Sequence, residues 1–217
     1  MEKFARWSGV VHAALPKIHR VKLGQVHQLL AACLGHASYA SFRESDLLVL
    51  NRGAHYVCFE EGAGLRRAHR LGIQLTQEQW REAWMALKPS GVSGHTWLIE
   101  PRGMDLAARL TFEGSGHPHI QAIKRAIGMG DGHWANSTRC LDETNALPEV
   151  LRFEVLGDVQ ASGNGVSISV PVIAECVFKR IGRRMYAAGE LLSVVQHGAP
   201  REYEPEFDGE FYGMSEG

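Results

Sequence analysis

The spacing of apolar residues changes from helical to strand-like along the chain. Residues 4–18 and 23–34 place apolar side chains every three or four positions, which indicates one buried helical face in each segment. Pro16 is expected to end or kink the first helix, and Gly35 to close the second in a left-handed conformation. Further helices are expected at 38–43, 65–71, 76–87 and 118–126, and short strands at 47–50, 56–59 and 97–100.

The second part of the chain has the clearest strand pattern. Apolar and polar residues alternate over 151–155, turn residues follow at 162–165, and the alternation continues over 166–178. Pro171 within the long run favours an edge position or a bulge, because proline lacks the amide that a central strand donates. Short apolar runs near 185–187 and 191–195 are expected to complete the sheet, whereas residues 129–147 show little periodicity and predict a long loop.

These elements predict an α+β fold: a helical N-terminal module followed by an antiparallel β-sheet domain with one or two helices. The run of Pro, Ser and Gly at 89–94 is the best boundary, because these residues favour turns and linkers. We therefore expect a mainly helical module over 1–90, an α+β domain over 95–200 and an acidic aromatic tail over 201–217.

Composition narrows the class of protein. The chain has 217 residues, 45% hydrophobic and 22% charged, which is typical of a globular protein. It shows no apolar run of about 20 residues, and its first residues do not resemble a secretory signal, so we expect a cytoplasmic protein without membrane contact. Four widely separated cysteines without a CxxC pair suit reduced thiols better than a disulfide framework.

Charge is distributed unevenly, although the net charge is only -1. Residues 1–90 carry 12 Lys and Arg against 7 Asp and Glu, whereas residues 91–217 carry 11 against 17. Such asymmetry marks either an interaction surface or two halves that attract each other.

Residues 23–43 resemble the first helix and turn of a helix-turn-helix motif, through the Leu-Ala-x-x-Leu-Gly spacing and the serine that follows. The resemblance implies that the next helix enters the DNA major groove and presents its N-terminal side chains to base edges. That helix would offer Tyr39, Ser41, Phe42 and Arg43, of which only the arginine suits bidentate base recognition. Small helical hairpins that bind no DNA share the pattern, and an overall isoelectric point near 6.8 is low for a nucleic-acid-binding protein.

Two surfaces are candidates for partner binding. The basic stretch of the first module contributes Lys17, Arg20 and Lys22, whose alternative interpretation is a solvated helix face. The tail combines six acids and one base with aromatic side chains, which suits a peptide that docks on a basic, apolar groove of another protein or of its own N-terminal half. The alternative interpretation is a disordered end without a partner, because chain termini are often poorly ordered. The candidate contact residues of the tail are Tyr203, Phe207, Phe211 and Tyr212.

A metal-assisted enzyme is a further alternative, centred on His117, His119, His133 and Cys140. Zinc requires three or four convergent ligands, which a His-x-His pair and a third histidine can supply. Pro118 separates the first two histidines, however, and no HExxH or CxxC spacing supports the set. Exposed or helix-capping histidines are therefore the favoured interpretation.

A cysteine nucleophile is also conceivable, with Cys58 beside His55 or Cys140 beside His133 as thiol and base. Neither pair lies in a known catalytic signature, and we expect no resident metal or cofactor.

The sequence thus favours a non-catalytic cytosolic protein-binding or adaptor protein. The partner is expected to be a protein, with nucleic acid as the alternative through residues 23–43, and the sequence leaves the oligomeric state open. The metal-assisted enzyme remains the second alternative.

Overall fold

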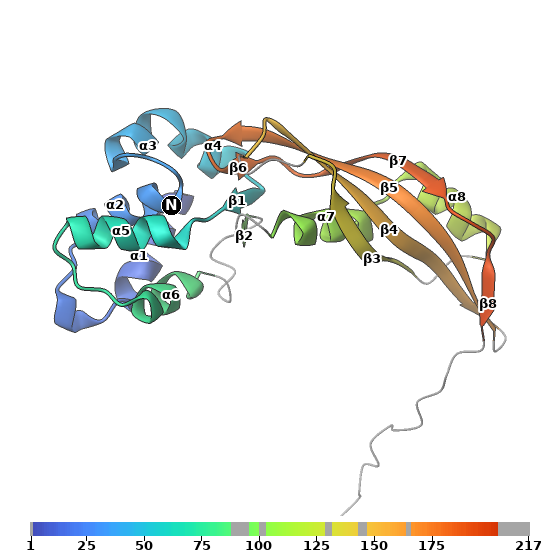
Figure 1. The fold of residues 1–217 in the computed structure, drawn as a ribbon, viewed down its shortest axis with the longest axis horizontal. Helices are drawn as coiled ribbons and strands as arrows, with labels where there is room; N and C mark the ends of the chain where they lie inside the picture. Colours follow the sequence, from blue (N-terminus) through green and yellow to red (C-terminus); the bar gives the residue numbers. More distant parts are fainter. Residues whose placement is uncertain are drawn as a thin grey trace, which may run out of the picture.

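The computed structural model describes residues 2–87, 96–99, 103–128, 132–142, 147–163 and 166–203, and it confirms the α+β class with helices first and sheet afterwards (Figure 1). The helices are α1 (Lys3–Ala14), the short 3₁₀ helix η1 (Lys17–His19), α2 (Leu23–Cys33), α3 (Tyr39–Ser45), α4 (Leu47–Arg52), α5 (Glu61–Arg70), α6 (Gln77–Met85), α7 (Met104–Glu113) and α8 (Pro118–Ala126). The strands are β1 (Tyr56–Cys58), β2 (Trp97–Ile99), β3 (Gly132–Cys140), β4 (Val150–Gly163), β5 (Val166–Gly182), β6 (Met185–Tyr186), β7 (Glu190–Gln196) and β8 (Arg201–Tyr203).

The expected boundary at 89–94 lies outside these described residues, so the division into domains stays a prediction. Within the described part of the chain, no helix has the length and apolarity needed to cross a membrane.

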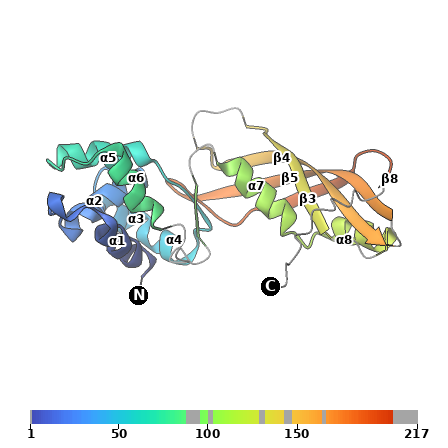
Figure 2. The same cartoon turned by 90° about the horizontal axis from the view of Figure 1, so that it is seen from below.

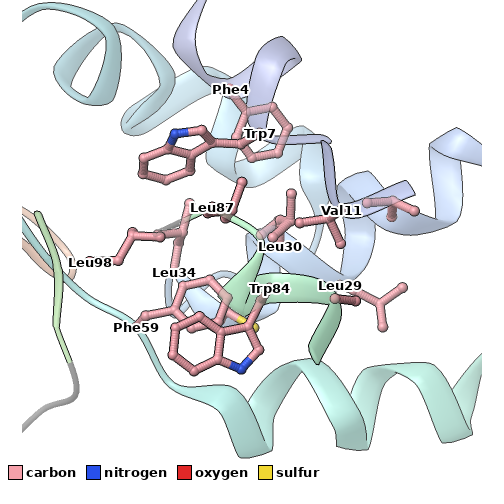
Figure 3. Packing of buried hydrophobic residues seen from close by; sticks show 14 of the residues in the cluster. Phe4, Trp7, Val11, Leu29, Leu30, Leu34, Phe59, Trp84, Leu87 and Leu98 are labelled. Carbon is pink, nitrogen blue, oxygen red and sulfur yellow. The ribbon is translucent and has the colours of Figure 1, made fainter. Parts of the chain in front are cut away.

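The first hydrophobic core lies among α1 to α6 at one end of the molecule (Figure 3). Figure 3 shows Trp7 and Phe4 of α1 on one side of this core, and Phe59 and Trp84 together on the other, with ring centroids 5.0 Å apart. Burial of each large apolar side chain contributes roughly 1.5–3 kcal/mol, which makes the periodic apolar positions of the helices its main source of stability.

Close packing inside this core requires one glycine. A Cβ atom at Gly64 of α5 would lie 2.5 Å from the Cys33 Sγ and 2.7 Å from the Trp80 ring. Gly64 thus allows α5 to approach α2 and α6 at a distance that any side chain would prevent. The second helix ends as expected at Gly35, whose φ is +86°, and α6 begins with the predicted capping box at Thr76.

The sheet has the order β2-β1-β6-β5-β4-β3, with β7 and β8 also paired to β5. All pairs are antiparallel except β1 with β2, which is parallel. α7 and α8 cover one face of the long strands, where Phe112 and Ile120 enter a second core with Phe153 and Phe178 (Figure 2). Pro171 lies between the part of β5 that pairs with β7 and the part that pairs with β8, so the ladder on that side is interrupted there.

β5 joins the two ends of the molecule. It is 17 residues long: the first 14, Val166 to Lys179, pair with β4, and Arg180 and Gly182 pair with β6 next to the helices. At this hairpin Met185 enters the helical core, and the Arg183 amide donates to the Asp46 carboxylate at 2.9 Å. The same carboxylate oxygen lies 3.0 Å from the Nε2 of His36, whose side chain is fully buried. A buried carboxylate thus connects the α2–α3 turn to a strand hairpin far along the chain.

Three features differ from the expectations. Residues 47–50 belong to α4 and not to a strand. A run of four apolar residues is too short to show either a helical or a strand period, and only Leu50 of this helix is buried. β3 lies within residues 129–147, where a loop was expected. It is an edge strand, and because only Ala135 is buried, its sequence lacks the alternation of apolar and polar residues that predicts a strand. Ile18 does not extend the apolar face of α1, because α1 ends before Pro16 and leaves its side chain 83% exposed.

The Asp46 contact predicts a large stability effect. Asp46→Ala leaves the His36 ring and the Arg183 amide without their acceptor, so we expect the free energy of unfolding to fall by about 2–4 kcal/mol. Urea unfolding followed by circular dichroism measures this change. The matched control is Glu44→Ala on the exposed surface of α3, which should change stability by less than about 0.5 kcal/mol. An equal response of the two variants would contradict the assigned role of Asp46.

Candidate functional site

A basic pocket lies at the end of the helical core that faces away from the sheet. It has a volume of about 290 Å³ and is lined by the end of α1, by η1 and by the segment that leads into α2. The lining residues are His12, Ala13, Leu15, Pro16, Lys17, Arg20 and Val21. A cavity of this size lies at the small end of ligand-binding sites and suits a single large side chain.

Local chain geometry forms this pocket. Leu15 is extended where Pro16 follows, so α1 ends there and the chain turns through η1. Val21 is buried against the core, and its carbonyl oxygen lies 2.8 Å from the Nε2 of His12, which joins the two walls.

Arg20 is the one non-glycine residue with positive φ, at +46°, among the described residues. A left-handed conformation costs an L-residue roughly 1–2 kcal/mol, and glycine or asparagine adopts it more easily. The arginine side chain forms part of the pocket lining in this strained position. Arg20 is the C-cap of η1, where its amide donates to the Lys17 carbonyl, and its left-handed conformation turns the chain from η1 toward α2.

The pocket rim is positively charged and carries an apolar side chain beside it. Lys17 and Arg20 are exposed, and within the described ranges neither forms a salt bridge. Lys22 follows at the start of α2, where its amide donates to the Gln25 side chain at 2.8 Å. Ile18 projects from the same turn. Lys17 and Arg20, with Lys22 nearby in sequence, can therefore attract an anionic partner, and Ile18 can contact an apolar side chain of that partner.

The other two predicted contact residues of the first module lie elsewhere. Tyr39 stacks on Phe4 of α1 with ring centroids 5.4 Å apart, and its ring also lies 4.7 Å from that of His27. Arg43 is exposed on α3, on the second helix of the hairpin. Lys17 and Arg20 thus both line the pocket, whereas Lys22, Tyr39 and Arg43 are not among its lining residues.

The helix-turn-helix-like segment forms the expected pair of helices, but other parts of the chain cover its turn. Arg183 donates to the Gly35 carbonyl at 3.0 Å, and Arg67 donates to the Ala37 carbonyl at 2.6 Å. α3 has only seven residues, and Phe42 at its centre is fully buried. Arg43 is the single exposed side chain with suitable chemistry among those expected to contact bases.

A serine, a histidine and an aspartate meet at this turn, and sequence reasoning missed this set. The Oγ of Ser41 lies 3.5 Å from the Nδ1 of His36, whose Nε2 contacts Asp46. The serine contact is at the outer limit of a hydrogen bond, and the histidine side chain is fully buried, away from any substrate in solution. Because Asp46 also binds the Arg183 amide, the set stabilises the contact between helices and hairpin.

The candidate metal ligands do not converge. The Nε2 of His133 lies 2.7 Å from the Phe112 carbonyl oxygen, and the Nδ1 of His119 lies 3.2 Å from the Val194 carbonyl oxygen. Cys140 is seven residues beyond His133 on β3, which corresponds to about 23 Å. His117 caps α8 through the His119 amide. Within the described part of the chain, no three His, Cys, Asp or Glu side chains form a group that could hold a metal ion.

The predicted tail contacts are placed only in part. The backbone of Tyr203 ends β8 opposite Ser167 of β5. Phe207, Phe211 and Tyr212 lie outside the described residues.

Comparison with known proteins gives no functional assignment: no protein family matches the chain, and neither a curated protein nor a solved structure is significantly similar to it. The pocket itself was missed from sequence because Ile18 fitted the helical period of α1. Pro16 was the available signal, since a helix that ends there leaves Ile18 without a place in the core.

The four cysteines differ in burial, which predicts how readily each thiol reacts and so tests the proposal that one of them is a nucleophile. Burial raises the pKa of Cys58 to about 12, that of Cys176 to about 12 and that of Cys33 well above its usual value, whereas Cys140 is exposed. At about pH 8 we expect a thiol reagent to modify one cysteine per folded chain, because buried thiols form almost no thiolate. Cys140→Ser should remove that reaction, and unfolding should expose all the others. A second fast thiol in the folded protein would contradict these assignments.

Proposed function

We propose that the protein binds acidic segments of partner proteins at the pocket formed by α1, η1 and the start of α2. The observation that carries the proposal is a pocket lined by Lys17 and Arg20, two exposed cations without ion-pair partners among the described residues. Ile18 follows Lys17 in η1 and is 83% exposed, so an apolar contact is available on the same short helix. Contact with Ile18 would supply hydrophobic free energy, and the cations would select for acidic side chains.

The geometry supports a protein partner over DNA. DNA recognition needs several free side chains on one helix, whereas the expected recognition helix buries Phe42 and packs Tyr39 on α1. A small pocket lined partly by Ala13, Leu15 and Val21 suits a peptide with one inserted side chain, because hot spots of protein interfaces are anchors that fill pockets.

We propose that this binding is non-catalytic and takes place in the cytosol. The support for the first point is that buried cysteines have raised pKa values and the candidate metal ligands do not converge among the described residues. The support for the second is that all four cysteines are free, which suits a reducing compartment.

Selection from a displayed library of random peptides tests the proposed function. We expect the immobilised protein to enrich peptides that combine Asp or Glu with an aromatic or large aliphatic residue. The affinity of an enriched peptide should fall roughly tenfold or more on Lys17→Glu with Arg20→Glu, because two attractive charges become repulsive. Ile18→Ser should weaken binding without altering its dependence on salt.

The matched control is Arg43→Glu, which reverses an exposed cation of the same module away from the pocket. Peptide affinity should stay within about twofold of the unmodified protein. Enrichment of peptides without acids, or a loss with Arg43→Glu equal to that of the double variant, would overturn the proposal. Preferential binding of duplex DNA that depends on Arg43 would favour the alternative function.

A further inference from the structure

One acidic aromatic segment of the proposed chemistry is part of the chain itself. Residues 201–217 contain six acids and one base, with aromatic residues among the acids. Phe211 and Tyr212 follow the acids at 206, 208 and 210 closely. The segment thus combines the negative charge and the apolar side chains that the basic pocket should bind.

The structure places the start of this segment far from the pocket of the same chain. β8 pairs with Ser167–Ser169, at the beginning of β5, whereas Asp46 of the helical part contacts the other end of β5, where Gly182 is followed by Arg183 (Figure 1). Figure 1 shows α1 and α2 at one end of the molecule and β8 at the other. Fifteen residues of strand separate Ser167 from Gly182, which corresponds to about 50 Å along β5. The segment that lines the pocket, residues 12–21 (blue in Figures 1 and 2), lies beyond that, at the end of the helical core away from the sheet.

The covalent reach of the segment is shorter than this separation. Tyr212 is nine residues beyond Tyr203, so even a fully extended chain carries it at most about 32 Å from the end of β8. The aromatic residues therefore cannot enter the pocket of their own chain. Only the pocket of another copy is within their reach.

We infer that residues 204–212 of one copy bind the basic pocket of a second copy, so that the protein associates head to tail. This inference rests on the proposed function of the pocket and adds the identity of one partner. Because each copy offers a pocket at one end and a segment at the other, the contact is heterologous. Such contacts produce open chains or closed rings, and not a two-fold dimer.

Sedimentation velocity of the full chain tests the inference. The average mass should rise at least about twofold over a hundredfold increase in protein concentration, and salt should reverse the rise, because exposed charges are screened within about 8–10 Å. Reversal of the pocket charges, Lys17→Glu with Arg20→Glu, should keep the protein monomeric. Reversal in the tail, Glu204→Lys with Glu206→Lys and Asp208→Lys, should do the same.

Mixing the two reversed proteins provides the decisive control for folding. Each is monomeric alone, but in the mixture every pocket meets a tail of opposite charge, so association should return. The control Arg43→Glu should associate like the unmodified protein.

A monomer at every concentration, or reversed proteins that stay monomeric when mixed, would overturn the inference. The peptide selection separates this result from failure of the proposed function. If acidic peptides bind the pocket while the protein stays monomeric, the pocket function holds and the partner is another protein. If neither is observed, both proposals fail.

Discussion

The carboxylate of Asp46 is the contact on which the arrangement of the molecule depends. It accepts a hydrogen bond from the backbone amide of Arg183 at the β5–β6 hairpin and contacts the buried His36 in the turn between α2 and α3. Two further contacts reinforce it: the Arg183 side chain binds the Gly35 carbonyl, and Arg184 forms an ion pair with Glu60. Because buried polar groups are costly without partners, these interactions fix one specific orientation of hairpin against helices. Because β5 runs from this hairpin to the opposite end of the sheet, the same contacts set the position of that end relative to the helices.

This rigid connection gives the molecule two distinct ends. The helical end carries a small pocket lined by Lys17 and Arg20, with the exposed Ile18 in the same short helix, and the other end carries β8, where the acidic segment begins. The sequence alone showed only that the two parts differ in charge, which is equally compatible with attraction within one chain. The length of β5 prevents the aromatic residues of the tail from reaching the pocket of their own chain. The opposite charges of the two ends therefore favour association between copies, head to tail.

Local features of the fold follow from the sequence, whereas the site does not. The period of two over 166–178, the capping box at Thr76 and the left-handed Gly35 depend on neighbouring residues, so their patterns identify them. The Asp46 contact joins positions 137 residues apart, which no local pattern reports. The pocket depends on the left-handed Arg20, a conformation that sequence statistics disfavour for arginine. Edge strand β3 escaped prediction because most of its residues face solvent.

Photochemical cross-linking between copies tests the central claim most directly. Phe211 is replaced by p-benzoylphenylalanine, isotope-labelled and unlabelled proteins are mixed, and the linked peptides are identified by mass spectrometry. We expect links from residue 211 to the segment 12–21. Among these links, we expect peptide pairs in which one peptide is isotope-labelled and the other is not, because the two come from different copies. Links to that segment confined to single chains, or links only to other surfaces, would contradict it.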